Sequence, residues 1–400
     1  MSAPLQGIRV LDFTRYQQGP WATLYLADLG ADVLKIEDPG IGDYGRRMFR
    51  EPDGFSPFFE ALDRGKRSVC IDLRHPAGRD LVLQMVDRAD VLAENFRPGT
   101  MDSFGLGWDV LHARNPRLVY GQATGWGTQG PMAEQPAFDQ IVQAYSGFAQ
   151  QAGGGPGHRP EIPFPGVADQ TGGMNFALGI MTALYVREHT GRGQRVEVSL
   201  LGTQLALQAP TLQYTLRHGI ERPRPFRSSP TVGHYECSDG RWVMIAGIDQ
   251  KFWPRIAKAV EREDLVHDPR FARGGGRTAN RDALEAEMAT AFRTRPSAYW
   301  LARLKEHDVP ASPVRGHEDL LTDEQVAANG YIQSVDHPKW GTLKVVGPHI
   351  NLSETPAHVA GPATPGHGEH TREVLRELGL DDDRIRALEA AGTVGTSPPG

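Results

Sequence analysis

The first 125 residues alternate between short apolar runs and longer amphipathic stretches. This pattern predicts strands over residues 8–14, 31–37, 66–73, 90–96 and 117–125, with helices over 20–30 and 76–89. Strands that are joined through helices run parallel in one sheet, and the helices cover both of its faces. The sequence therefore predicts an α/β fold with a mostly parallel sheet.

Beyond residue 125 the pattern is more varied. Residues 170–188 are apolar almost all round, which is typical of a buried helix. Residues 217–230 are basic and rich in proline, as in a linker. Residues 234–247 alternate as a hairpin that turns at Asp239 and Gly240. Further helices are expected over 249–262, 279–293, 296–306 and 369–379, with strands over 193–201 and 340–353.

These changes in pattern predict a large domain and a small one. We expect the N-terminal part of a large α/β domain over 1–215, a linker over 216–224 and a small α+β domain over 225–330. Residues 331–400 would be a linker and a C-terminal segment that returns to the large domain. Ligands of such sheets bind beyond the carboxyl ends of the strands, so the residues that follow each strand are candidates for a site.

Composition indicates an ordinary globular protein, with 39% hydrophobic and 23% charged residues. No apolar run reaches the ~20 residues that span a bilayer, and the start of the chain lacks the pattern of a secretory signal. Cys70 and Cys237 lie far apart and form no C-x-x-C pair. We therefore expect a cytoplasmic protein with no membrane partner.

The formal net charge is −6. Binding to nucleic acid needs a basic field, so nucleic acid is not expected as the main partner. A small polyanionic ligand is compatible with this charge if its basic contacts are local.

A single carboxylate, Asp169, stands among small and neutral residues in FPGVADQTGG (164–173). An Asp just before a helix commonly caps it by accepting a hydrogen bond from an early amide. The positive end of the helix dipole would also keep a nucleophilic carboxylate ionised. The following Thr-Gly-Gly would let a ligand approach the backbone closely. The residues alone leave both roles open, and the two are compatible.

Three other clusters follow predicted strands. ENFRPG (94–99) offers an amide, a flat ring and a guanidinium that can bind phosphate, although it also fits an ordinary turn. Arg74 follows another strand, and RYQQGP (15–20) joins the first strand to the first helix. RYQQGP lacks G-x-G-x-x-G, and GGGPG (153–157) lacks the Lys-Ser/Thr of a P-loop. No H-E-x-x-H or comparable metal cluster and no G-x-S-x-G elbow occurs in the sequence.

Taken together, these stretches resemble the class III CoA-transferase family, of which formyl-CoA transferase is the familiar member. The matching stretches are GIRVLDFTRYQQGP, LGADVLKIEDPGIGD, GKRSVCIDL, ENFRPG, NPRLVYGQATGWG, GVADQTGG, REHTGRGQRVEVSL and, near the C-terminus, GHGEHTREVLRELG. They occur in the family's order and cover most of the chain, and residues 225–330 match most loosely.

The resemblance implies an enzyme that moves coenzyme A from an acyl-CoA to a carboxylic acid acceptor. It implies that Asp169 is the nucleophile, which forms an anhydride and then an aspartyl-CoA thioester. The implied CoA-binding residues are Gln17, Gln18, Ile71, Arg74, Asn95, Phe96, Arg97, Ala137 and Phe138. It also implies a Rossmann-like large domain, a small domain, long linkers and an interlocked homodimer. CoA and acyl-CoA are substrates, and no permanently bound cofactor or metal is expected.

Some positions depart from the formyl-CoA-type pattern. Asp38 stands where those enzymes have Arg, Pro136 stands where they have Lys, and their tetraglycine loop has no counterpart. These differences argue against an oxalate-for-formate exchange. The alternative within the same fold is an alpha-methylacyl-CoA racemase, which needs a second base. That subfamily has His in a G-H-D stretch where this chain has Phe138 before Asp139, so a racemase is disfavoured. A binding protein without activity is disfavoured by Asp169.

Overall fold

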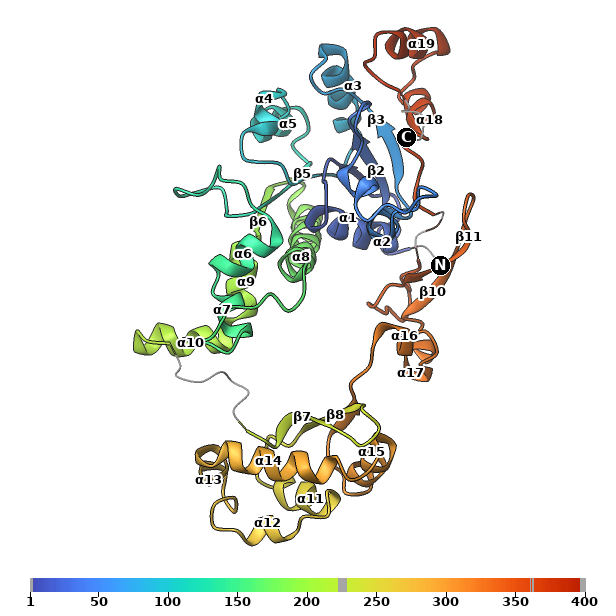
Figure 1. Cartoon of the computed structure of the whole chain (residues 1–400). Helices are drawn as coiled ribbons and strands as arrows, with labels where there is room; N and C mark the ends of the chain where they lie inside the picture. Colours follow the sequence, from blue (N-terminus) through green and yellow to red (C-terminus); the bar gives the residue numbers. More distant parts are fainter. Residues whose placement is uncertain (1–2, 222–228, 360, 362, 396–400) are drawn as a thin grey trace. The chain divides into compact units, whose positions relative to one another are not determined.

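The computed structural model describes residues 3–221, 229–359, 361 and 363–395, and the chain divides into two compact units (Figure 1). The first unit comprises residues 1–153, 159–212 and 327–400, and the second comprises 154–158 and 213–326. Part of the expected linker 216–224 lies outside the described residues. The expectation differs from the structure at residues 216–218, which end a helix, α10 (Ala209–His218).

The first unit is built on a six-stranded parallel sheet with the strand order β3-β2-β1-β4-β5-β6. Its strands are β1 (Arg9–Asp12), β2 (Asp32–Glu37), β3 (Arg67–Cys70), β4 (Val91–Glu94), β5 (Val119–Thr124) and β6 (Arg195–Ser199). The order reverses at β1, where Leu11 lies opposite Leu34 of β2 and Leu92 of β4. The α/β fold with a mostly parallel sheet is confirmed, and this reversal is where open sheets of this kind place a ligand.

Successive apolar side chains of β1 point to opposite faces of the sheet. Val10 belongs to the core that α1 and α8 form on one face, and Leu11 belongs to the core under α3, α5, α18 and α19 on the other. Figure 1 shows these two groups of helices around the sheet. The helices are α1 (Gln18–Asp28), α3 (Pro76–Val86), α5 (Trp108–Arg114), α8 (Val167–Thr190), α18 (Thr371–Glu377) and α19 (Asp382–Ala390). Two covered faces explain why β2, β4 and β5 are buried along almost their whole length.

Shorter elements complete the first unit. They are η1 (Tyr44–Arg47), α2 (Pro57–Asp63), α4 (Thr100–Ser103), α6 (Asp139–Tyr145), α7 (Phe148–Ala152) and α9 (Leu200–Leu207). The expected strand over 340–353 is wrong in extent: β11 (Gly341–Val346) pairs antiparallel with β10 (Ile332–His337). The hairpin was missed because its first strand is polar and lacks a clear alternation.

The second unit contains a three-stranded antiparallel sheet, β7-β8-β9, and several helices. The expected hairpin is present as β7 (Val232–Glu236) and β8 (Trp242–Ala246), and β9 (Ala311–Pro313) pairs with β8. The helices are α11 (Phe252–Ala259), α12 (Asp264–His267), α13 (Gly274–Ala279), α14 (Arg281–Phe292), α15 (Ser297–Glu306) and α16 (His317–Leu320), with α17 (Glu324–Ala328) at the boundary. Trp253, Phe292 and Trp300 fill its own core. No helix in the described part of the chain is long and apolar enough to cross a bilayer.

A group of fully buried charges lies inside the first unit, which the hydrophobic pattern did not predict. Lys66 Nζ donates to Asp63 at 2.7 Å and to Asp12 at 3.0 Å, and Lys35 Nζ lies 2.7 Å from Asp43 and 3.2 Å from Asp63. Burial alone would raise the pKa of the Asp12 carboxyl, but Lys66 and Lys35 hold it below its usual range. We call these five residues the buried charge network.

The buried charge network holds the turn that follows β1. Asp12 accepts hydrogen bonds from the amide and the hydroxyl of Thr14, and Lys35 donates to the Thr14 carbonyl. Two residues later, Tyr16 has a φ of 63°, a left-handed conformation that costs a non-glycine residue free energy. The network therefore stabilises the turn that leads into α1.

Candidate functional site

Asp169 lies in the first turn of α8, and it is not the cap of that helix. The helix begins at Val167, and its N-cap residue is Gly166, with a φ of 98°. The expectation that Asp169 is the N-cap residue is therefore wrong, since the chain enters the helix earlier than the polar pattern indicated. The Asp169 side chain is instead half-buried in the wall of a cavity.

The cap of α8 comes from a different helix. The buried carboxylate of Asp139, the first residue of α6, accepts hydrogen bonds from the amides of Gly166 at 2.8 Å and Ala168 at 2.7 Å. It also accepts one from the Asp169 amide at 3.2 Å. Three early amides of α8 are thus satisfied by one carboxylate, which fixes the direction of the Asp169 backbone.

The pKa of Asp169 is raised to about 7. Burial is the main cause, and the negative charge of Asp139 adds to it. Sequence reasoning expected the helix dipole to keep this carboxylate ionised, but burial and a second carboxylate outweigh that effect. Asp169 is therefore a carboxyl group that changes its protonation state near neutral pH.

The glycines after Asp169 serve helix packing. A Cβ on Gly173 would lie 2.6 Å from the carbonyl oxygen of Gln18, and one on Gly172 would lie 2.8 Å from the Gln18 amide nitrogen. A Cβ on Gly166 would meet Gln17 Nε2 at 2.5 Å. The expected space for a ligand at Thr-Gly-Gly is therefore taken by the start of α1, which brings Gln17 and Gln18 to the N-terminus of α8.

The cavity beside Asp169 has a volume of about 260 Å³, and we call it the Asp169 pocket. Most of the residues that the sequence predicted to form the functional site line this cavity. Its walls include Gln17, Gln18, Asn95, Phe96, Arg97, Ala137, Phe138 and Asp169. These residues come from the ends of β1 and β4, the segment after β5 and the start of α8, which meet at one edge of the sheet.

Aromatic rings form one side of the Asp169 pocket. The Tyr16 ring stacks on Tyr44 with centroids 5.1 Å apart and meets the edge of Phe138 at 5.7 Å. Phe138 is 56% exposed, so a large apolar ring faces open space next to a carboxyl group. Exposed apolar area of this kind is typical of a ligand site.

Some residues of the segment after β4 support the fold, and others line the Asp169 pocket. The Asn95 side chain bonds both the amide and the carbonyl of Arg15, at 2.8 and 2.7 Å, so it ties two strand ends together. Burial raises the pKa of Glu94 to about 7, and Glu94 accepts a 2.7 Å bond from the Phe96 amide. Arg97 is exposed, and within the described part of the chain its guanidinium makes no hydrogen bond or ion pair, which leaves it available to an anion.

A second cavity of about 240 Å³ adjoins the first through Phe96, and we call it the Arg74 pocket. Ile71 and Arg74 line it, as does Arg15, whose guanidinium lies 4.8 Å from the centroid of the Phe96 ring. Sequence reasoning did not single out Arg15, although its place directly after the first strand could have indicated it.

Arg74 is already engaged by two carboxylates. Its Nε lies 2.8 Å from Asp72 and its Nη2 lies 3.2 Å from Asp38. Asp38, at the position where the resemblance implies Arg, therefore both removes a positive charge and pairs with a neighbouring one. An anion at this end of the site would compete with Asp38 for Arg74.

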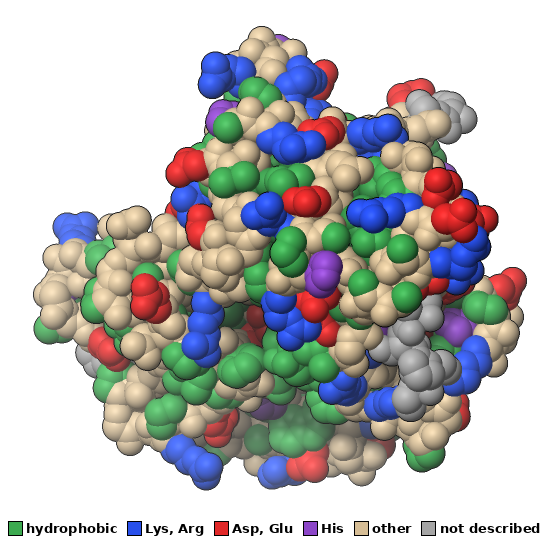
Figure 2. All heavy atoms as spheres, turned by 90° about the horizontal axis from the view of Figure 1, so that it is seen from above, with side chains coloured by type: hydrophobic (Ala, Val, Ile, Leu, Met, Phe, Trp, Pro, Cys, Tyr) green, Lys and Arg blue, Asp and Glu red, His purple; other side chains and the backbone are tan. Residues whose placement is uncertain are grey.

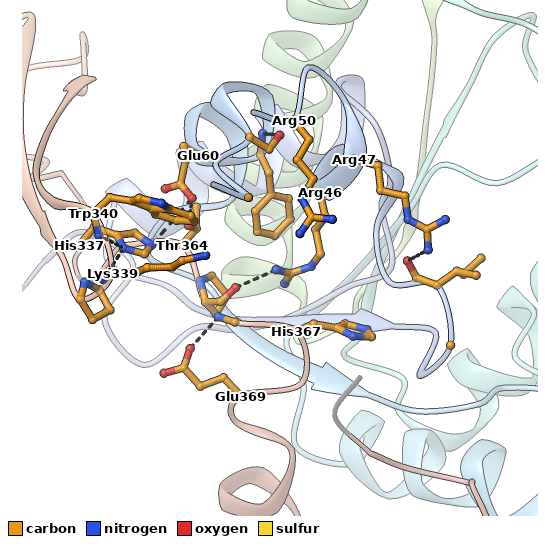
Figure 3. Close-up of a pocket in the computed structure, with 18 residues that line it drawn as sticks. Arg46, Arg47, Arg50, Glu60, His337, Lys339, Trp340, Thr364, His367 and Glu369 are labelled. Carbon is orange, nitrogen blue, oxygen red and sulfur yellow. Dashed lines mark hydrogen bonds and ion pairs between the residues drawn. The ribbon is translucent and has the colours of Figure 1, made fainter. Parts of the chain in front are cut away.

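A third cavity, of about 620 Å³, is larger than these two, contains none of the predicted site residues and is shown in Figure 3. We call it the Arg46 pocket, after the arginine in its wall. On the face shown in Figure 2, basic and acidic side chains are interspersed and do not form one basic patch. Within the described ranges, no three His, Cys, Asp or Glu side chains gather as a metal site.

Comparison with known proteins identifies the class. The chain matches the model of "CoA-transferase family III" over residues 5–371. It is 33% identical to a formyl-CoA:oxalate CoA-transferase of Streptomyces coelicolor, over 98% of this chain and 99% of that protein. It is 35% identical to an acetyl-CoA:oxalate CoA-transferase of Acetobacter aceti, over 82% of this chain and 85% of that one.

A solved structure agrees. A CaiB/BaiF family protein of Brucella suis superposes with a TM-score of 0.84 at 31% identity, over 94% of this chain and all of that one. The chain belongs to CoA-transferase family III, and it is a transferase of that class. The resemblance stated from the motifs is thereby confirmed, and the named relatives do not favour the racemase alternative.

Proposed function

We propose that this enzyme transfers coenzyme A between carboxylic acids with Asp169 as a covalent nucleophile. The observation that carries the proposal is a half-buried carboxylate at a helix N-terminus, in a pocket whose walls hold the residues that the family resemblance implies for CoA binding. His, Cys and Lys side chains are not part of that pocket wall as described, so Asp169 is its strongest candidate nucleophile.

The first half-reaction loads CoA on the enzyme. An ionised Asp169 oxygen attacks the thioester carbon of the donor, the carbon–sulfur bond breaks, and the CoA thiolate leaves with the electron pair. The thiolate then attacks Cγ of Asp169 in the mixed anhydride and expels the donor acid as a carboxylate. The product is an aspartyl-CoA thioester, so the energy of the thioester bond is kept.

The second half-reaction runs the same steps in reverse order with a new acid. The acceptor carboxylate attacks Cγ, the CoA thiolate leaves, and a second anhydride forms. The thiolate attacks the acceptor's carbonyl carbon, which gives the product thioester and restores the Asp169 carboxylate. No net proton is consumed, but water must be excluded because anhydrides hydrolyse.

The two adjoining cavities suit the two ends of CoA. Arg15 and Arg97 are the cations most available to the phosphates, because Arg74 is paired with Asp38 and Asp72. The thiol end would lie in the Asp169 pocket, and the aromatic rings of Tyr16 and Phe138 would contact the acyl group. The same rings leave no second base there for a racemase.

The experiment that tests the function is a panel of acyl-CoA donors and carboxylic acid acceptors. The relatives are named for formyl-CoA, acetyl-CoA and oxalate, so these compounds come first although the sequence departures argued against the formyl–oxalate pair. We expect at least one pair to exchange CoA, and hydroxylamine treatment of the loaded enzyme to modify Asp169. Mass spectrometry measures both. If no pair exchanges CoA but a 2-methylacyl-CoA exchanges its α-proton, the enzyme is a racemase.

The transfer rate should follow the ionisation of Asp169. A pKa of about 7 means that the nucleophile is mostly protonated below pH 7. We therefore expect kcat/KM to rise with pH up to about 7 and to level off above it. A profile that is flat from pH 5 to 8, measured in buffers of constant ionic strength, would contradict this assignment.

Asp139→Asn should move that profile to lower pH. The substitution removes the charge that helps to raise the pKa of Asp169, while burial remains. It also weakens the cap of α8, which should cost roughly 1–2 kcal/mol of stability. The matched control is Asp109→Asn, an exposed carboxylate in the first turn of α5, which should shift neither the profile nor the stability.

We also propose that the chain works as a homodimer. One side of α8 packs on the sheet, and the other exposes Met174, Leu178 and Tyr185, the last two at 64% and 67%. Leu205 and Leu207 extend the exposed apolar residues into α9. A second copy that covers this surface would remove it from water. Light scattering measures the mass, and the interlocked arrangement stays a prediction.

Two free, buried cysteines support a reducing cytoplasm.

A further inference from the structure

The Arg46 pocket gathers positive side chains in a protein that is acidic overall. Arg46, Arg47, Arg50 and Lys339 line it, together with Glu60 and Glu369. In Figure 3 the side chains of Arg46, Arg50 and Lys339 extend toward the middle of the pocket, whereas Arg47 turns aside to the Ile41 carbonyl. Cations from two distant parts of the chain therefore converge on one space.

Gly54 shows how closely two of these cations approach. A Cβ at Gly54 would lie 3.2 Å from Lys339 Nζ and 3.4 Å from a guanidinium nitrogen of Arg50. Both groups thus flank the same glycine, where a side chain would displace them. Lys339 Nζ is anchored on the Asp53 carbonyl at 2.9 Å, and one bond leaves ammonium hydrogens for another acceptor.

The two carboxylates that line the pocket accept hydrogen bonds from other groups of its wall. Glu60 accepts a hydrogen bond from the Thr364 hydroxyl, and burial raises its pKa. Glu369 accepts the Gly366 amide at 2.7 Å and extends away from the middle of the pocket in Figure 3. Glu37 pairs with the Arg46 guanidinium through both carboxylate oxygens, and Arg46 also donates to the Pro365 carbonyl at 2.9 Å, which fixes that guanidinium in the wall. An anion placed between Arg50 and Lys339 would be attracted by both charges.

We propose that the Arg46 pocket binds a small anion with two negative charges, such as a phosphate group or a short dicarboxylate, independently of CoA transfer. Its volume of about 620 Å³ lies within the range of small-molecule sites. Arg50 and Lys339 bind the anion directly, and Arg46 supplies a fixed guanidinium face. Trp340 and Phe59 give the same pocket apolar walls, so the ligand carries a flat or apolar part next to its charge.

The test measures the binding of inorganic phosphate and of malonate to the full chain by calorimetry, at constant ionic strength. We expect saturable binding of at least one probe, weakened about tenfold or more by Arg50→Gln and by Lys339→Gln, because each removes a charged donor. Both side chains are exposed, so the variants should fold, and thermal unfolding without ligand checks this.

Two control variants locate the binding. Arg97→Gln changes the Asp169 pocket, and Arg79→Gln removes a charge from α3 outside the three cavities. Neither should affect binding if the anion lies in the Arg46 pocket. Binding that is lost in Arg97→Gln but kept in Arg50→Gln would place the anion at the CoA site and overturn the proposal. The absence of saturable binding for both probes would also overturn it.

Discussion

Asp169→Asn is expected to reduce CoA transfer by about 10³-fold or more, because an amide cannot form the anhydride or the thioester that carries the reaction. CoA binding should stay within roughly threefold of wild type, since the side chain keeps its volume and Arg15 and Arg97 are untouched. Initial rates with the best donor and acceptor, together with calorimetric CoA binding, measure the two quantities. Transfer that persists at the wild-type rate would refute the nucleophile assignment.

The matched control is Glu161→Gln, which removes an exposed carboxylate from the connection that precedes α8 and should leave the rate unchanged.

The stability of the Asp169→Asn variant gives a second, independent result. The folded protein holds the Asp169 proton up to about pH 7, whereas an ordinary Asp loses its proton near 3.8, so the wild type loses stability as the pH rises between these values and the loss is complete above about 7. Above that pH the Asn variant should therefore be more stable than wild type, by roughly 1–3 kcal/mol.

Lys66→Met should destabilise the first unit by about 3–5 kcal/mol, because it leaves Asp12 and Asp63 buried without their ammonium partner. Lys66 also donates to the Thr23 hydroxyl and the Pro20 carbonyl, at 2.9 and 3.1 Å. Chemical denaturation of the full chain, followed by hydrogen exchange at the amides of β1 and β2, measures the loss in the strands that carry the network.

A double variant separates charge from packing. Adding Asp63→Asn to Lys66→Met removes one of the unpaired charges and should restore at least about 1 kcal/mol. Lys344→Met, at an exposed position of β11, is the control and should change stability by less than about 0.5 kcal/mol. Equal effects of Lys66→Met and Lys344→Met would mean that the network contributes nothing to stability.

The parallel sheet was predictable because its signal is local. Strands such as β2 and β4 are covered on both faces, so they are short apolar runs between amphipathic helices, and the pattern of 31–37 and 90–96 found them. In the mostly exposed hairpin of β10 and β11 the signal is weaker. The polar strand β10 was missed, and β11 was extended into residues that form no strand.

The candidate site could be named from motifs because its residues follow successive strands. Gln17, Asn95 and Phe138 lie far apart in the chain, yet parallel strands bring their carboxyl ends to one edge, where Asp169 joins them. Whether these residues bind CoA stays a prediction. The motifs also identified the family, because motifs and their order can be read from the sequence without knowledge of the fold.

What the local sequence could not supply was the surroundings of each charged group. Three contacts join residues that are distant in sequence: Asp139 caps α8, Asp38 pairs with Arg74, and Asp12 pairs with Lys66. The pKa of Asp169 follows the same rule, because burial and a neighbouring carboxylate exist only in the folded chain. The sequence thus determined the sheet and the family and pointed to Asp169 as the candidate nucleophile, while the tertiary structure decided how α8 is capped and how the pKa of Asp169 shifts.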